Sequence, residues 1–190
     1  MRRIKKKGYS DVLVEMVKKV KYKELYDGVM SKKAYCSLCL FSHEGIAEIA
    51  PSLVVELNRE RVIEVDVDSH KLLRVNGEEV KGIEHAQVLN LSDDGERWEG
   101  DVLNNQPYGW GVLYDSENRI VYEGFRIGEV NVCYGRSYYP DIHTVEYEGM
   151  IYEGKRWGRG VQYDRNGKTM FEGEWMNGEP VEKTVTITDE

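Results

Sequence analysis

The stretch YEGMIYEGKRWGRGVQYD, residues 147–164, decides the fold class of this chain. It opens with an aromatic residue, a glutamate and a glycine, and it ends on a Gly-x-Gly pair, Gly158 and Gly160, followed by Tyr163. Glycine-rich stretches also form phosphate loops, but a P-loop needs Lys and then Ser or Thr after its second glycine. A dinucleotide loop needs a third glycine where Tyr163 stands. Neither motif is present, so these glycines need another explanation.

The same pattern begins four times along the chain, at starts that step by 24, 25 and 24 residues. The four starts are Trp98-Glu99-Gly100, Tyr122-Glu123-Gly124, Tyr147-Glu148-Gly149 and Phe171-Glu172-Gly173. Thirteen residues after the first three starts comes another glycine, and three residues later a tyrosine: Gly111, Gly135 and Gly160; Tyr114, Tyr138 and Tyr163. So many matching columns at a nearly fixed period indicate tandem repeats.

Each repeat unit is predicted to be one β-hairpin. Alternate residues of a strand share a face, so the opening aromatic residue and the glycine two places on point to one side and the glutamate to the other. Turn residues follow each first strand: Asn104, Asn105, Gly128, Gly154, Asn177 and Gly178. The second strands are expected over GWGVLY, CYGRSY and GRGVQY.

The recurring glycines are interpreted as seats for aromatic rings. Glycine inside a strand normally lowers stability, so its recurrence needs a cause. A missing side chain leaves a space that a ring from the adjacent strand can cover. We therefore expect a ladder of rings (Trp98, Tyr122, Tyr147, Phe171) lying over a ladder of glycines.

This pattern resembles the MORN repeat (membrane occupation and recognition nexus), whose units read approximately Y-x-G-x-W, a turn, then G-x-G. The resemblance covers residues 98 to about 178, under half of the chain. It implies consecutive antiparallel hairpins in an elongated, twisted, single-layer sheet. It also implies interaction work: self-association, scaffolding at membranes or cytoskeleton, and phosphoinositide binding in some members. Some MORN arrays are attached to lysine methyltransferases or lipid kinases, and the rest of this chain is too short for either.

Two departures from the pattern stand out. Cys133 replaces the first glycine of the Gly-x-Gly pair in the second unit, and the fourth unit has Thr184 at position thirteen. The strand Lys183–Thr188 is then expected to act as a terminal cap, which solenoids need to close an exposed edge.

The chain before the repeats is expected to supply a helix and further strands. Apolar residues recur at three- and four-residue spacing over 10–26, which predicts a short amphipathic α-helix. Residues 53–91 have a strand-like texture, and 75–82 mirror a repeat start, so we expect this stretch to extend the sheet and shield its first edge. The predicted fold is mainly β, with tandem hairpins in one elongated, twisted antiparallel layer. The predicted divisions are 1–43, 44–95 (cap with one degenerate repeat), 96–183 (repeats) and 184–190 (capping strand and tail).

Composition and charge limit the function classes. The net charge of −8 disfavours nucleic-acid binding, which needs a basic face. Residues 1–29 are the exception, with nine Lys or Arg and four Asp or Glu, a net of +5. Three cysteines, an odd number, favour a reducing compartment, and no apolar run reaches the ~20 residues of a membrane span. We expect a cytoplasmic protein, peripheral at a membrane or the cytoskeleton as the alternative.

The candidates for chemistry are weak. Cys36, Cys39 and His43 are spaced like metal ligands, but a structural zinc takes four and the second pair is missing, so buried thiols are the preferred interpretation. His43, His70, His85 and His143 are interpreted as surface or turn residues, because no nucleophile stands beside them with a carboxylate. No cofactor, metal or catalytic residue is predicted.

The glutamate column (Glu99, Glu123, Glu148, Glu172) is interpreted as a solvated acidic stripe, with a docking track for a basic peptide as the alternative. Like charges on neighbouring strands repel, so we expect cations between them from Arg126, Lys155, Arg156 or Arg165. Trp110, Tyr134, Trp157 and Trp175 are the predicted contact aromatics, with plain packing as the alternative.

Two functions remain open at this point. The first is a non-enzymatic protein-interaction or scaffolding module that binds a protein partner or a second copy of itself. The alternative is attachment to an anionic membrane surface through the basic helix, with Lys18, Lys19, Lys21 and Lys23 as the lipid-contacting residues.

Overall fold

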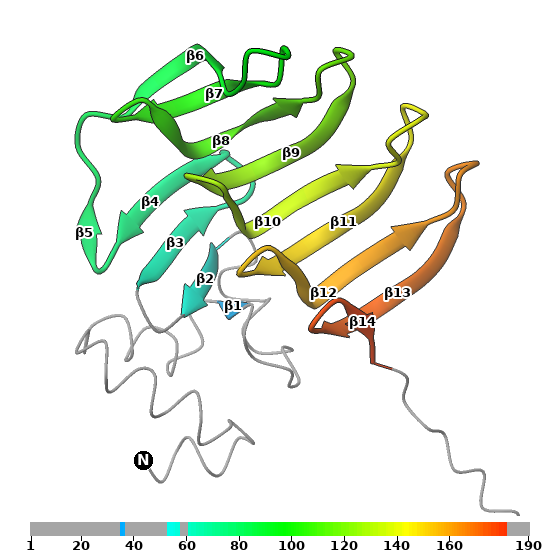
Figure 1. Cartoon of the computed structure of the whole chain (residues 1–190). Coiled ribbons are helices and arrows are strands. Elements are labelled where there is room, and N and C mark those ends of the chain that lie inside the picture. The colour runs from blue at the N-terminus through cyan, green and yellow to red at the C-terminus, as the bar shows by residue number, and fades with distance from the viewer. Residues whose placement is uncertain (1–34, 37–52, 58–60, 182–190) are drawn as a thin grey trace, which may run out of the picture.

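The computed structural model describes residues 35–36, 53–57 and 61–181, and this part of the chain is all-β. It forms a nine-stranded sheet and a five-stranded sheet (Figure 1). The predicted fold class of antiparallel hairpins in an open, twisted sheet is confirmed. The predicted helix over 10–26 and the capping strand Lys183–Thr188 lie outside the described residues.

The nine-stranded sheet is a simple meander, because every strand pairs with its neighbours in the sequence. Its strands are β6 (Glu84–Asn90), β7 (Arg97–Leu103), β8 (Gln106–Tyr114), β9 (Ile120–Ile127), β10 (Val130–Tyr138), β11 (Val145–Tyr152), β12 (Lys155–Tyr163), β13 (Thr169–Met176) and β14 (Glu179–Pro180). The predicted first and second strands of units one to three are therefore β7 to β12, and the fourth unit has the short return strand β14.

A second sheet was not expected from the sequence. It contains β1 (Tyr35–Cys36), β2 (Leu53–Leu57), β3 (Val62–Asp66), β4 (Lys71–Val75) and β5 (Glu78–Glu79), in that order. The prediction that residues 53–91 extend the repeat sheet is correct for β6 only, which pairs with β7 at the sheet edge. The remaining strands fold back over one face of the nine-stranded sheet, so that part of it is covered by a second layer (Figure 1).

A row of seven directly opposed glycines crosses the nine-stranded sheet. The row runs Gly100, Gly111, Gly124, Gly135, Gly149, Gly160, Gly173, one residue on each strand from β7 to β13. Neighbouring glycines approach closely; a methyl group built on Gly124 would lie 2.5 Å from Cα of Gly135. Only glycine allows this approach, so the row fixes the register of the repeats.

Rings cover these glycines from one face, as predicted. Trp98 lies over Gly111 on the next strand, and Tyr122 and Tyr147 cover the corresponding glycines of β10 and β12. Phe171 lies over Gly173 of its own strand. Trp98, Tyr122, Tyr147 and Trp175 are almost fully buried in one apolar cluster with Val102 and Ile151. We call this side the ring face.

The first glycine of the Gly-x-Gly pair marks a left-handed backbone position. Gly109 and Gly158 have φ of 132° and 84°, and Cys133, which replaces the glycine in the second unit, has φ of 61°. Ala86, at the same place in the degenerate unit, has φ of 53°. The backbone conformation therefore recurs even where the residue is not glycine, at a cost of about 1–2 kcal/mol for a side chain in this region.

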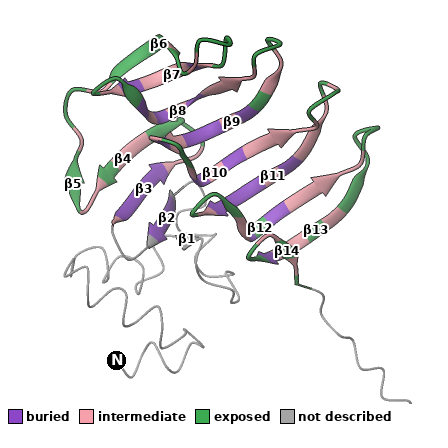
Figure 2. Ribbon diagram, viewed as in Figure 1, coloured by how far each residue is buried: buried purple, intermediate pink, exposed green. Residues whose placement is uncertain are grey.

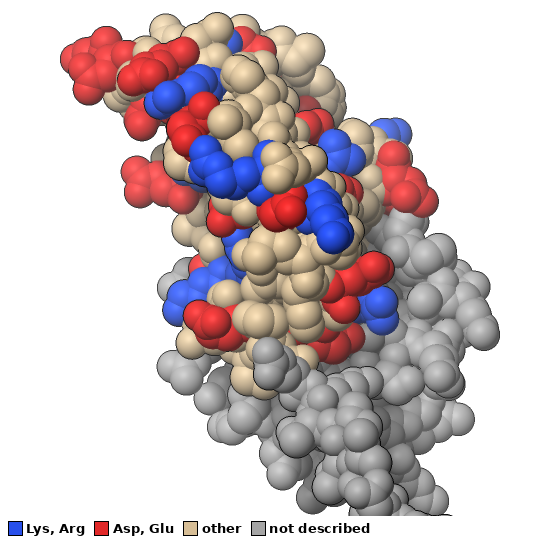
Figure 3. All heavy atoms as spheres, turned by 90° about the vertical axis from the view of Figure 1, so that its right-hand side faces the viewer, with Lys and Arg blue, Asp and Glu red and all other residues tan. Residues whose placement is uncertain are grey.

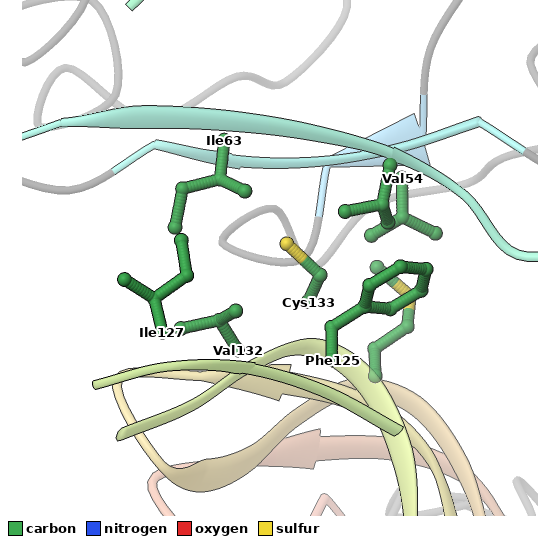
Figure 4. Packing of buried hydrophobic residues seen from close by; sticks show 8 residues of the cluster. Val54, Ile63, Phe125, Ile127, Val132 and Cys133 are labelled. Carbon is green, nitrogen blue, oxygen red and sulfur yellow. The ribbon is translucent and has the colours of Figure 1, made fainter. Parts of the chain in front are cut away.

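The second sheet packs against β9, β10 and β11 through a separate apolar core. Val54, Ile63 and Val65 from the second sheet meet Phe125, Ile127, Val132, Cys133 and Met150. Figure 4 shows the Cys133 thiol pointing from β10 toward the second sheet. In Figure 2 the buried residues run through β2 and β3 and through the strands beneath them, whereas β5 and β6 are mostly exposed.

A buried carboxylate ties the two sheets together. Glu56 on β2 is fully buried, and its Oε2 accepts a hydrogen bond from the Cys133 amide at 2.8 Å. Its Oε1 accepts one from the Glu153 amide at 3.3 Å. Cys133 and Glu153 both have left-handed φ angles, 61° and 48°, so Glu56 satisfies amides that lie at irregular points of the repeat sheet.

Candidate interaction surface

The glutamate column lies on the face opposite the rings. In register, the row beside the glycines reads Val88, Glu99, Val112, Glu123, Arg136, Glu148, Val161, Glu172 from β6 to β13. Directly opposed residues share a face, and residues two apart on a strand do as well, so this row lies on the side that also carries Phe125 and Ile127. We call this side the glutamate face. The second sheet covers part of it.

No two glutamates of the row lie on adjacent strands. A valine separates Glu99 from Glu123 and Glu148 from Glu172, and Arg136 separates Glu123 from Glu148. Arg136 Nε lies 3.3 Å from Glu148 Oε1, and its Nη1 lies 4.0 Å from Glu123 Oε2. One guanidinium therefore bridges two carboxylates that are each about a quarter exposed.

The cations predicted to lie between the glutamates contact other residues instead. Arg126 donates to the Gly128 carbonyl and the Asn131 side chain, and Lys155 donates to Asn177. Arg156 pairs with Glu146 at 3.3 Å and lies over the Tyr147 and Trp175 rings, and Arg165 pairs with Asp141. The expectation was wrong because Arg126 and Arg156 lie on the ring face, Arg156 over the rings themselves. Arg136 and Arg97, which pairs with Glu99 at 2.8 Å, are the arginines that share the glutamate face with these carboxylates.

Two tyrosine hydroxyls donate hydrogen bonds to the same two carboxylates. Tyr134 Oη donates to Glu148 at 2.9 Å, and Tyr138 Oη donates to Glu123 at 3.2 Å. Burial, with the nearby Glu148 charge, raises the pKa of Tyr134. Burial, with the Glu123 charge, likewise raises the pKa of Tyr138. Both phenols therefore remain donors at neutral pH, whereas Arg136 Nε, although 3.3 Å from Glu148 Oε1, makes no hydrogen bond.

A groove of about 280 Å³ opens on this face over β10–β13. It is lined by side chains of Tyr134, Glu148, Arg159, Val161, Tyr163 and Glu172 and by backbone of the glycine row. Within the described ranges, Glu172 makes no ion pair, and its side chain is exposed. The groove offers aromatic, aliphatic and acidic side chains together.

The predicted contact aromatics fall into different environments. Tyr134 is half-buried and lines the groove. Trp110 is half-buried; its ring stacks on His70 at 3.7 Å, with an edge contact to Phe125. Trp157 is half-buried against Tyr152. Trp175 is 1% exposed inside the ring-face cluster, so its burial corrects the expectation that it contacts a partner.

A second hollow, a cleft of about 990 Å³, lies where the two sheets diverge. Its lining includes the His70–Trp110 stack, and His85, whose Nδ1 lies 2.6 Å from Asp101 Oδ1. Its lining also contains basic and acidic residues: Lys71, Arg74, Lys81, Glu79 and Asp101. Because its lining carries both positive and negative charges, the cleft does not indicate a particular class of ligand. Sequence reasoning missed this pairing of histidines with Trp110 and Asp101, because the sequence does not indicate which segment folds back over the repeat sheet.

Several predicted sites lie outside the described residues. These are His43, Cys39, the side chain of Cys36 and the lysines Lys18, Lys19, Lys21 and Lys23. Among the residues that the structure describes, no group of His, Cys, Asp and Glu is arranged to hold a metal ion. The same described residues contain no helix that is long and apolar enough to cross a membrane.

The charged side chains are mixed in sign on the side of the molecule that Figure 3 shows. On the side shown in Figure 3, Lys and Arg are interspersed with Asp and Glu, and the described residues there form no continuous patch of one sign.

No family model matches the chain, and no curated protein matches it.

Proposed function

We propose that this protein is a non-enzymatic protein-interaction module, and that its binding surface is the glutamate face over β11–β13. The second sheet packs on the same face over β9–β11, which leaves β12 and β13 beyond its core contacts. The surface to be bound is therefore the continuation of a face that the protein itself already uses for packing.

The observation that carries this proposal is the groove around Val161. It combines two tyrosines, a valine, two glutamates and Arg159, and its floor is the glycine row, whose backbone is fixed by the rings beneath. Tyrosine is enriched at interfaces because it combines a large apolar area with a polar tip. A rigid sheet also loses little conformational entropy when it binds a partner.

The resemblance to MORN repeats supports the same class of function and adds scaffolding and self-association as its expected forms. The partner is then a protein segment or a second copy of this chain. Membership of that family remains a prediction.

Comparative capture from cell extract tests the proposal. The full chain is compared with Tyr163→Ser and Val161→Glu on the glutamate face, and with Glu117→Gln in the exposed β8–β9 turn as the matched control. We expect partners that the parent and the control retain and that both face variants lose. If every captured protein is retained by the face variants, or the parent captures none and is strictly monomeric, the proposal is wrong.

The alternative function, attachment to an anionic membrane, is supported by the sequence of residues 1–29, with its net charge of +5 and its four lysines on one side of an apolar pattern. Each basic residue near an anionic surface contributes about 1 kcal/mol. Flotation with phosphatidylserine vesicles, with and without residues 1–29, tests it. Binding that survives the deletion would contradict a role for this segment.

A further inference from the structure

The row of the glutamate face contains its own example of how a cation is held between two of its glutamates. Arg136 occupies the position between Glu123 and Glu148 and reaches both carboxylates. The neighbouring strands lie ~4.8 Å apart, so each such position is flanked by carboxylates whose strands are ~10 Å apart. A guanidinium fits this spacing because its planar fork can serve two acceptors at once.

The equivalent position one unit later is occupied by Val161, between Glu148 and Glu172. Valine is short and neutral, and the groove of about 280 Å³ opens at this point. Arg159 also lines the groove, but in register it lies opposite Glu174 rather than between the two glutamates. No described cation therefore stands where Arg136 stands in the preceding unit.

The first unit has the same residue type, Val112, between Glu99 and Glu123. Both of these glutamates, however, already pair with an arginine. Arg97 pairs with Glu99 at 2.8 Å and lies over the Tyr114 ring at 3.9 Å, and Arg136 reaches Glu123. There are three positions between successive glutamates. Among them, only the Val161 position is flanked by an exposed glutamate, Glu172, that pairs with no described cation.

We infer that the Glu148–Val161–Glu172 position binds one arginine side chain of a basic segment in the protein partner. The guanidinium takes the place that Arg136 takes one unit earlier, with the Tyr134 and Tyr163 rings along the sides of the groove. Tyrosine faces attract guanidinium groups, and arginine is favoured over lysine because it can bridge two carboxylates and stack on a ring. This inference rests on the proposed function and names the chemistry that its partner must carry.

An internal substitution tests the fit without any ligand. The melting temperature of Val161→Arg should equal or exceed that of Val161→Gln, whose side chain is neutral and similarly long. The difference in melting temperature between these two variants should shrink in 1 M NaCl and in a Glu172→Gln background. Val161→Glu, which places three like charges in a row, should melt below both. A lower melting temperature for Val161→Arg than for Val161→Gln would overturn the inference, because the position would then not accept a guanidinium.

Titration with a small probe tests the binding itself. The probe is N-acetyl-arginine amide, and the matched control is N-acetyl-citrulline amide, which has the same shape and no charge. We expect saturating shifts of the Val161 methyl signals with the arginine probe, at least fivefold larger than with citrulline, and abolished in Val161→Arg. Glu172→Gln should weaken binding about threefold to tenfold, and Arg159→Gln, which removes a like charge from the rim, should strengthen it. Equal shifts with both probes would overturn the inference.

The outcome for the partner is separable from the outcome for this position. If partner capture is lost in Tyr163→Ser but kept in Val161→Arg, the face binds a partner and the arginine position is wrong. If neither variant changes capture, the proposed function fails as well.

Discussion

Replacing Gly135 by alanine should destabilise this protein far more than a glycine-to-alanine change in a strand normally does. Gly135 has no left-handed φ, so alanine meets no backbone strain there. Its methyl group, however, would lie 2.5 Å from Cζ of Tyr122, well inside contact distance. Tyr122 cannot move aside easily, because it is 1% exposed and its hydroxyl donates to the Phe125 carbonyl at 2.7 Å.

The expected loss of unfolding free energy in Gly135→Ala is the sum of the packing and hydrogen-bond changes that the new methyl group causes. Overpacking a well-packed site costs about 1–3 kcal/mol. Loss or distortion of the Tyr122 hydrogen bond adds about 1 kcal/mol. We therefore expect a loss of about 2–4 kcal/mol in unfolding free energy, measured by urea denaturation, and a fall in melting temperature of about 2–4 °C per kcal/mol.

Two variants separate ring-over-glycine packing from other effects of alanine. Gly178→Ala, at a turn with φ of 87° and no atom within 4 Å of the added methyl group, measures backbone strain alone and should cost about 1 kcal/mol. In a Tyr122→Leu background, the ring is gone, and Gly135→Ala should cost less than about 1 kcal/mol. The reasoning is refuted if Gly135→Ala costs no more than Gly178→Ala, or if its cost is the same with and without the ring.

Three further predictions concern Glu56 and Cys133, which lie at the contact between the sheets, and Glu64, which is buried in the second sheet. Glu56→Ala should lower stability by about 2–5 kcal/mol because the buried Cys133 amide and the part-buried Glu153 amide lose their acceptor. Glu56→Gln should fall between the parent and Glu56→Ala, since its amide oxygen can still accept one bond, and an unchanged urea midpoint would contradict the role of these hydrogen bonds. Cys133→Gly should be more stable than Cys133→Ala by about 1 kcal/mol, reversing the usual order, because φ at this position is 61°; thermal melts of both decide it. Burial raises the pKa of Glu64, although Arg74 at 3.4 Å opposes this, so Glu64 favours the folded state when protonated and that stability is lost as pH rises through its folded pKa. In urea unfolding, the stability of Glu64→Gln relative to the parent should therefore be greater at pH 7 than at pH 4. A relative stability that is lower at pH 7 than at pH 4 would contradict this prediction.

Much of this fold could be predicted because the repeat columns carry their own geometry. The period of 24 or 25 residues, the alternation within each strand and the paired turn residues together define hairpins, faces and register. The seating of Trp98, Tyr122 and Tyr147 over glycines follows from the same columns, since a ring and an absent side chain at matched positions have few other reasons to recur.

The second sheet was missed, although the repeats contain a signal for it. Three residues after each start stand Asp101, Phe125, Met150 and Glu174. The two apolar members belong to the units beneath the second sheet and are buried in its contact, whereas Asp101 and Glu174 belong to the outer units. What could not be read is which segment covers them, because Glu56 and Glu64, both buried, interrupt the apolar pattern of β2 and β3.

The same column explains why the glutamate face divides into a covered part and an open part. Where the protein supplies its own second layer, the face is apolar at Phe125 and Met150 and its charges are neutralised internally by Arg136. One unit later both features change together, since Glu174 replaces the apolar residue and Val161 replaces the arginine. Valine is the usual residue between the glutamates, as at Val112 and Val161, and Arg136 is the exception. What distinguishes the Val161 position is the exposed Glu172, with which no described cation pairs, so this is the charge that we expect a partner to neutralise.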